Sequence, residues 1–246
     1  MHRRSIEIYP DPRALSHAAA GRTVSILEER LAGNGFATLV LTGGRTPKPV
    51  YELLASQAYV DQVDWDRIHF FWGDERCVPP EDPESNFGMA WSAFVSKIRP
   101  PAGNIHRMRG GMGDPAAAAS LYEAEIRHIL PGIDIPSFDL VLLGMGADGH
   151  TASLFPGTSW EDEKLVVSTQ APDSGIRRIS MTPRLLNSAT AVLFLVTGAN
   201  KAETLVRVLR DPAGDLPASK IDPVHGSLTW MVDEAAGRLV QDMRPA

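Results

Sequence analysis

An aspartate and a histidine two residues apart, Asp148 and His150, are the side chains of this sequence best suited to acid–base chemistry. They lie in a glycine-rich turn that directly follows the apolar segment 138–143. Histidine exchanges protons near neutral pH, and a neighbouring carboxylate can orient its ring. We therefore predict that His150 is a general base and that Asp148 is its orienting partner. A structural histidine is the simpler alternative.

The glycine-rich turn at 144–149 also bears on whether this site could bind a dinucleotide cofactor. Its glycines, Gly146 among them, allow the backbone to adopt left-handed conformations and to approach a ligand closely. Residues 144–149 match the dinucleotide pattern G-x-G-x-x-G, but that fingerprint needs a full helix after it. Here Pro156 allows only about one helical turn, at Thr151–Leu154. We therefore expect no nicotinamide or flavin at this turn.

A second glycine turn lies at residues 43–46, and it has the features of a phosphate site. It follows the apolar strand predicted at 38–41 and precedes a helix whose first turn contains Pro47. Such a turn presents backbone N–H groups and the positive end of a helix to an anion. Candidate binding residues are Gly43, Gly44, Arg45 and Thr46. A turn that merely requires a positive φ explains the two glycines equally well.

Further polar residues follow other predicted strands. Asp74 and Arg76 come after the strand at 68–72, where a solvated loop with a local ion pair is the alternative. Lys201 follows the strand at 191–196 and is otherwise a surface lysine at the start of a helix. Arg178 alternates with Ser180 and Thr182 along a strand, a pattern that an exposed sheet edge also explains.

Strands and helices alternate along the whole chain, which predicts an α/β fold. Because parallel neighbours need crossover connections, we expect a single-domain, doubly wound, mostly parallel, Rossmann-like sheet with helices on both faces, spanning residues 1–246. The carboxyl ends of parallel strands lie along one edge, where open α/β sheets bind ligands. The expected strands are at 6–9, 38–41, 68–72, 138–143, 165–168, 179–181, 191–196 and 230–232, and the main helices are at 12–33, 47–54, 86–98, 115–130 and 202–209.

Composition narrows the range of partners. The chain has 246 residues and a net charge of −6, without an extended basic run, so nucleic acid is not an expected partner. The single cysteine, Cys77, excludes an internal disulfide framework, and neither a signal peptide nor an apolar stretch of 18 residues is present. These features predict a cytoplasmic protein that does not bind membranes. We expect it to be a monomer or a weak homodimer. The histidines do not have metal-site spacing, so no metal is expected.

Five motifs occur in the order found in the 6-phosphogluconolactonase family, which this chain resembles over nearly its whole length. They are GGRTP at 43–47, WGDER at 72–76, SN at 85–86, LGMGADGHTASLFP at 143–156 and LPAS at 216–219. The resemblance implies hydrolysis of 6-phospho-D-glucono-1,5-lactone to 6-phospho-D-gluconate in the oxidative pentose phosphate pathway, without a cofactor. The partner would be this small phosphorylated sugar lactone.

The resemblance also implies a set of site residues. His150 and Asp148 would be catalytic, and Arg45 stands where serine is common in the family. The substrate-binding and phosphate-binding residues would be Gly43, Gly44, Arg45, Thr46, Asp74, Arg76, Ser85, Asn86, Gly146, Arg178 and Lys201.

Two other functions remain open. Glucosamine-6-phosphate deaminase shares the glycine turn, but its loop resembles G-H-I-A-F-N-E-P, with a glutamate where this chain has Phe155. It also has D-E-Y where this chain has D-E-R at 74–76, and both departures favour the lactonase. A sugar-phosphate sensor that binds without catalysis is the third possibility.

Overall fold

The computed structural model describes residues 3–131, 134–211 and 214–240. The strands are β1 (Arg3–Tyr9), β2 (Ala37–Leu41), β3 (Ile68–Trp72), β4 (Asp74–Arg76), β5 (Leu140–Gly144), β6 (Val166–Gln170), β7 (Arg177–Met181), β8 (Ala191–Val196) and β9 (Ser227–Asp233). The α-helices are α1 (Pro12–Gly33), α2 (Pro47–Leu54), α3 (Asn86–Ala90), α4 (Ser96–Ile98), α5 (Pro115–Ile129), α6 (Pro183–Leu186), α7 (Ala202–Arg210) and α8 (Glu234–Gly237). Shorter helical segments include η3 (Trp91–Val95), η6 (Ala199–Lys201) and η7 (Pro217–Lys220).

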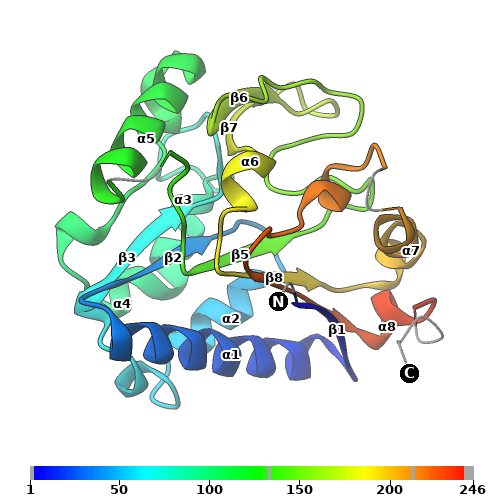
Figure 1. Cartoon of the computed structure of the whole chain (residues 1–246), viewed down its shortest axis with the longest axis horizontal. Helices are drawn as coiled ribbons and strands as arrows, with labels where there is room; N and C mark the ends of the chain where they lie inside the picture. Colours follow the sequence, from blue (N-terminus) through cyan, green and yellow to red (C-terminus); the bar gives the residue numbers. More distant parts are fainter. Residues whose placement is uncertain (1–2, 132–133, 212–213, 241–246) are drawn as a thin grey trace.

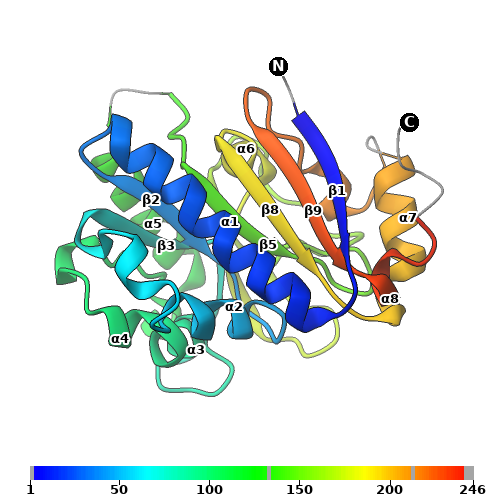
Figure 2. The same cartoon turned by 90° about the horizontal axis from the view of Figure 1, so that it is seen from below.

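Over the described residues, six strands form one parallel sheet in the order β1-β9-β8-β5-β2-β3. Helices α1 and α2 cover one face, while α5, α6 and α7 lie over the other (Figure 1). Seen from below, α1 to α4 lie in front of the sheet (Figure 2). The predicted α/β fold, with a parallel sheet between helical layers, is confirmed. None of the helices in the described ranges is both long and apolar enough to cross a membrane.

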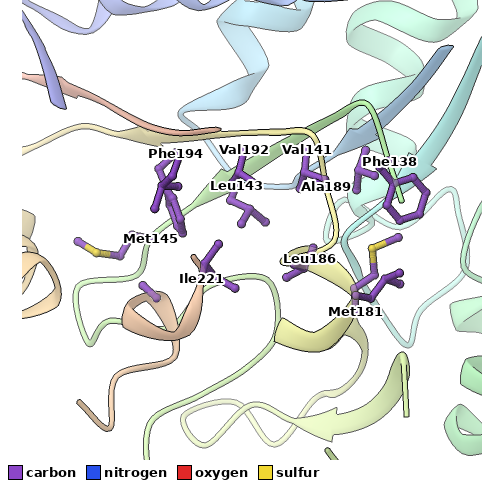
Figure 3. Packing of buried hydrophobic residues seen from close by; sticks show 14 of the residues in the cluster. Phe138, Val141, Leu143, Met145, Met181, Leu186, Ala189, Val192, Phe194 and Ile221 are labelled. Atoms are coloured by element: carbon purple, nitrogen blue, oxygen red, sulfur yellow. The ribbon is translucent and has the colours of Figure 1, made fainter. Parts of the chain in front are cut away.

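The central strands are buried on both faces, as the apolar segment after Phe138 predicted. Along β5, Val141 and Leu143 pack toward α5 to α7, while Leu140 and Leu142 pack toward α1 and α2. Strand β8 alternates in the same way. Figure 3 shows the first of these faces, where residues from β5 and β8 meet Leu186 and Ile221 from the covering layer.

A second, antiparallel sheet, β4-β7-β6, was not predicted. The strands expected at 165–168 and 179–181 exist, but they belong to this small sheet and not to the parallel one. The segment 74–76, predicted as a polar turn, is strand β4, and it pairs with β7. The alternative interpretation of Arg178, Ser180 and Thr182 as an exposed edge is also wrong, since β7 is the middle strand and all three residues are buried.

Two local predictions are corrected as well. The helix expected at 86–98 is interrupted by the π-helical segment η3. Thr151–Leu154 forms no helix; Thr151 and Leu154 instead make a tight antiparallel bridge, and Ala152 between them has φ +47°. The Thr151 hydroxyl donates to the carbonyl of Gly144, which ties this turn back to the end of β5.

The order of strands creates a crevice between β5 and β2. The chain proceeds outward from β2 to β3 on one side and from β5 to β8 and β9 on the other. Crossover connections therefore leave in opposite directions from the carboxyl ends of β2 and β5, and ligands of open α/β sheets bind at such points. Both predicted glycine turns, 43–46 and 144–149, lie there.

At the opposite end of β3, a chain of hydrogen bonds joins three elements. His69 on β3 bonds through Nδ1 to Nε2 of His106 at 2.9 Å, and Nδ1 of His106 bonds to Oε1 of Glu125 on α5 at 2.8 Å. The two imidazole rings lie side by side and nearly parallel, with an interplanar angle of 2°. With Nδ1–H of His106 donated to the carboxylate, the neutral His106 ring can accept from His69 at Nε2, and Nε2 of His69 is then free to take a proton.

This cluster predicts a loss of stability in mild acid. Burial, together with the nearby His106, lowers the pKa of His69, so the folded state disfavours its charged form. The stabilisation is therefore complete above the ordinary histidine pKa of about 6.5 and is lost as the pH falls below it. The free energy of unfolding of the wild-type protein should fall more between pH 7.5 and 5 than that of His69→Gln. His17→Gln, at an exposed position on α1, should retain the wild-type slope; equal slopes for all three proteins would contradict this account.

Candidate active site

A cleft of about 480 Å³ opens at the carboxyl ends of β2, β5 and β8. It brings together segments far apart in sequence, from Pro12 at the start of α1 to Lys201 in η6. Ten of the predicted site residues line it: Gly43, Gly44, Arg45, Thr46, Asp74, Arg76, Asn86, Gly146, His150 and Lys201. Ser85, Asp148 and Arg178 are not among the lining residues; Ser85 and Arg178 are buried, whereas the Asp148 side chain is half-exposed beside His150.

His150 and Asp148 form the expected pair. Nδ1 of His150 lies 2.7 Å from Oδ1 of Asp148, and the backbone N–H of His150 donates to the same oxygen at 3.1 Å. Since a carboxylate only accepts, Nδ1 carries the proton and Nε2 retains its lone pair. The hydrogen bond from His150 is the main reason why the pKa of Asp148 is lowered to about 2, although burial opposes the shift. Asp148 is therefore ionised wherever a histidine can act as a base.

Glycine at position 146 is required for this pair. A Cβ at Gly146 would lie 2.1 Å from Nδ1 of His150 and 2.3 Å from Oδ1 of Asp148. The turn is closed by hydrogen bonds from the N–H of Gly146 to the carbonyl of His150 and from the N–H of Gly149 to the carbonyl of Gly146. Gly149 has φ +90° and packs against Leu216. The imidazole ring of His150 therefore packs directly against the backbone of Gly146, at the wall of the cleft.

The turn at 43–46 joins the end of β2 to the start of α2. Gly44 has φ +101°, so the positive φ predicted for this turn occurs there. The Thr46 hydroxyl lies 2.9 Å from the Thr197 hydroxyl, which connects the turn to the loop after β8. The Tyr51 hydroxyl bonds to both the N–H and the carbonyl of Thr42 at 2.8 Å, which fixes the end of β2. The turn is held from two sides, as a preorganised anion site requires.

Beside this turn, part of the cleft wall is made of buried polar groups. Asn86 presses on the backbone of Gly43 so closely that a Cβ there would lie 1.8 Å from Oδ1 of Asn86. Its amide donates to the carbonyl of Asp74 at 2.9 Å. The Asp74 carboxylate accepts from the Ser153 hydroxyl at 2.6 Å. Asp74 is therefore not part of a solvated loop, since it is 6% exposed and faces the cleft.

Among the described residues, the cationic side chains of Arg45, Arg76 and Lys201 line the cleft, and that of Arg178 lies just behind it. Arg76 and Arg178 are directly opposite each other across β4 and β7, and the buried Nε of each lacks a hydrogen-bond partner among the described residues. Burial, and next the charge of Arg76, lower the pKa of Arg178. Burial also lowers the pKa of Lys201, with the neighbouring Arg45 acting in the same direction. An anion in the cleft would relieve both repulsions.

Three residues of this site were missed in the sequence. Thr197 directly follows the buried strand β8, the position that had drawn attention to Lys201, and this could have identified it. Ser153 lies in the segment 143–156 but was given no role. Glu75 stands between Asp74 and Arg76 but was not named among the candidates, yet it is only 2% exposed.

The arrangement suits the transfer of an acyl group to water. The free Nε2 of His150 can accept a proton from water, while the cations and the turn at 43–46 can hold an anionic group of the substrate. No group of three or more histidine, cysteine or acidic side chains suited to a metal ion occurs in the described ranges.

Comparisons with known proteins agree on one family. Residues 10–230 match the model of the family described as glucosamine-6-phosphate isomerases/6-phosphogluconolactonase. A 6-phosphogluconolactonase of Haemophilus influenzae is 44% identical over 81% of this chain and 86% of its own length. One from a Nostoc species is 40% identical over 96% of this chain and 98% of its own. The crystal structure of a 6-phosphogluconolactonase from Thermotoga maritima superimposes with a TM-score of 0.82, at 35% identity, covering 94% of this chain and all of that one.

Proposed function

The chain belongs to the family of glucosamine-6-phosphate isomerases and 6-phosphogluconolactonases, and on this premise we propose that it hydrolyses 6-phospho-D-glucono-1,5-lactone to 6-phospho-D-gluconate in the pentose phosphate pathway. The observation that carries the proposal is the pairing of His150 with Asp148 in the cleft that also contains the turn at 43–46. A lactone with a phosphate at the far end of the sugar needs a base and an anion site at the two ends of one cavity.

In the proposed reaction, Nε2 of His150 takes a proton from a water molecule as the water oxygen attacks the lactone carbonyl carbon. The tetrahedral anion then collapses, the bond from that carbon to the ring oxygen breaks, and the protonated imidazole returns its proton to the ring oxygen. The Asp148 carboxylate holds the ring and stabilises its charged form in between. The N–H groups of Gly146 and Gly149 are already donated within their own turn, so the oxyanion must find donors elsewhere in the cleft.

The phosphate would lie on the turn formed by Gly43, Gly44, Arg45 and Thr46, at the start of α2. Lys201 and Arg76 line the same cleft and would supply charge to it. Arg178 does not line the cleft, so we assign it an indirect role, in which its charge reinforces that of Arg76 across the strand pair.

If Lys201 binds the phosphate, replacing it with methionine should raise KM for the phosphorylated lactone roughly 10- to 100-fold, because hydrogen bonds to charged groups contribute about 1.5–3 kcal/mol. KM for unphosphorylated glucono-1,5-lactone should stay within about twofold of the wild-type value, since that substrate has no phosphate. Steady-state kinetics with both lactones measures the difference. Lys97→Met, at an exposed position on α4 that does not line the cleft, is the matched control. Equal changes for the two lactones would remove Lys201 from the phosphate site.

Deamination is the alternative within the family, and the neighbourhood of His150 disfavours it. The ring of Phe155 lies 5.0 Å from the imidazole and is 7% exposed. This apolar side chain cannot relay the proton that opening an amino-sugar ring requires. Phe155 thus leaves His150 suited to a substrate that needs only an activated water.

The function is tested by titrating acid release from freshly prepared 6-phosphogluconolactone at constant pH, after correction for spontaneous hydrolysis. The proposal predicts acid release in proportion to enzyme concentration, and no ammonia from glucosamine 6-phosphate. Ammonia release would make the protein a deaminase. Binding of 6-phosphogluconate without either reaction would make it a sensor.

A further inference from the structure

We propose that Glu75 is a positioning residue for the sugar phosphate, a buried carboxylate that fixes the wall of the cleft without touching the substrate. The inference rests on the proposed lactonase function and extends it to a residue outside the cleft. Glu75 is 2% exposed and does not line the cleft. Its neighbours on β4, Asp74 and Arg76, do line it.

The Glu75 carboxylate accepts four hydrogen bonds, which use both of its oxygens. Oε1 accepts from the backbone N–H groups of Arg76 and Asn86, each at 2.7 Å. Oε2 accepts from the Ser85 hydroxyl at 2.9 Å and from the N–H of Phe87 at 2.8 Å. Burial raises the pKa of Glu75, and these four donors oppose the rise. The Glu75 side chain therefore accepts hydrogen bonds from backbone N–H groups at the start of α3 that have no acceptor within the helix.

This network fixes the position of Asn86. The loop 77–85 separates β4 from α3, and Glu75 holds the far end of that loop against the strand. Asn86 can then donate to the carbonyl of Asp74 while its amide packs on Gly43. Gly43 is the first residue of the proposed phosphate turn. The chain of contacts therefore runs from Glu75 through Asn86 to the backbone that would bind the phosphate.

A glutamine at this position preserves the shape but not the acceptors. In either orientation of the glutamine amide, its –NH₂ group faces a backbone N–H that donates a hydrogen bond to the carboxylate of Glu75 in the wild-type protein. Two donors would then face each other. The loop must shift to separate them, and Asn86 moves with it. Displacements of about 1 Å in a positioned site cost up to roughly 100-fold in rate or binding.

Glu75→Gln should therefore raise KM for the phosphorylated lactone and Kd for 6-phosphogluconate roughly tenfold or more. The kcat value and its dependence on pH should change less than about threefold, because His150 and Asp148 are untouched. KM for unphosphorylated glucono-1,5-lactone should stay near the wild-type value. Kinetics with both lactones, together with calorimetric titration of 6-phosphogluconate, measures this pattern.

Glu123 offers a matched control. Its carboxylate accepts from the backbone N–H groups of Leu165 and Val166 at 2.9 and 3.2 Å, and it does not line the cleft. Glu123→Gln should lower the unfolding temperature while leaving KM for both lactones unchanged. A purely structural role for Glu75 would make the two variants behave alike.

The outcomes separate this inference from the proposed function. A wild-type protein without lactonase activity overturns the function, and a wild-type Kd for 6-phosphogluconate in Glu75→Gln overturns the positioning role. A selective rise in KM and Kd supports it. If Glu75→Gln does not fold, Glu75→Asp takes its place, because it keeps the charge and withdraws both oxygens by one methylene. Glu75→Asp should show the same selective rise in KM for the phosphorylated lactone and in Kd for 6-phosphogluconate. A wild-type KM in this variant overturns the inference.

Discussion

Replacing His150 with alanine should lower kcat for 6-phosphogluconolactone by about 10²–10⁴-fold, the range typical of a lost general base. The imidazole is the group in the cleft that has a free lone pair and an ionised partner holding its other nitrogen. Binding should survive, because the phosphate would be held at the turn 43–46 and not by the imidazole. The Kd of 6-phosphogluconate should therefore stay within about threefold of the wild-type value.

The comparison needs one control and one correction. His128→Ala, at an exposed position on α5, removes a histidine that does not line the cleft and should retain full activity. Spontaneous hydrolysis must be subtracted, since a lactone is already reactive without an enzyme. If kcat of His150→Ala stays within about tenfold of wild type, His150 is not the base.

Gly146→Ala should have the second-largest effect, with kcat lowered roughly 100-fold or more. The added methyl group would occupy the space between His150 and Asp148, 2.1 Å from one side chain and 2.3 Å from the other. Both side chains are partly exposed and can rotate away from the added methyl group, so the protein should fold with nearly unchanged stability. What is lost is the alignment of the pair, not the turn.

A double mutant makes this prediction sharper. If Gly146→Ala acts by displacing His150, adding it to His150→Ala should lower kcat no further, because residues that act as a unit are not additive. Gly103→Ala, where a Cβ meets nothing within 4 Å, is the control for the substitution itself. Additive losses in the double mutant would mean that Gly146 acts through some other contact.

The parallel sheet could be predicted because its signals are local. Strands such as 68–72 and 191–196 are short apolar segments ended by polar or glycine residues, and their observed bounds match. The turn at 144–149 could also be located, because glycines at the end of a buried strand have few other uses. From these patterns and the parallel direction of the strands, one cleft containing His150, Lys201 and the turn at 43–46 was expected.

The small sheet could not be predicted, because its stability depends on distant partners. Strand β4 consists of three charged residues, Asp74 to Arg76, and no local pattern distinguishes it from a solvated loop. Asp74 is buried because Ser153 donates to it from 79 positions away in sequence, and Glu75 is buried because four donors surround it. Buried charges of this kind are set by the tertiary structure and not by the residues beside them.

The same limit applies to Arg178. Its alternation with Ser180 and Thr182 correctly indicated a strand, but alternation cannot distinguish an exposed edge from a strand covered on both faces. Only the pairing with β4 places Arg178 opposite Arg76, behind the cleft wall. A role in direct contact with phosphate, as predicted from sequence, becomes in our proposal a supporting one.

The central claim is that one cleft holds the lactone carbonyl at His150 and the phosphate at the turn 43–46. A crystal structure with 6-phosphogluconate bound tests it most directly. We predict the C1 carboxylate within about 3.2 Å of Nε2 of His150, and the phosphate on the N–H groups of the turn with Lys201 beside it. A ligand bound with its phosphate against His150, or outside this cleft, would contradict the account.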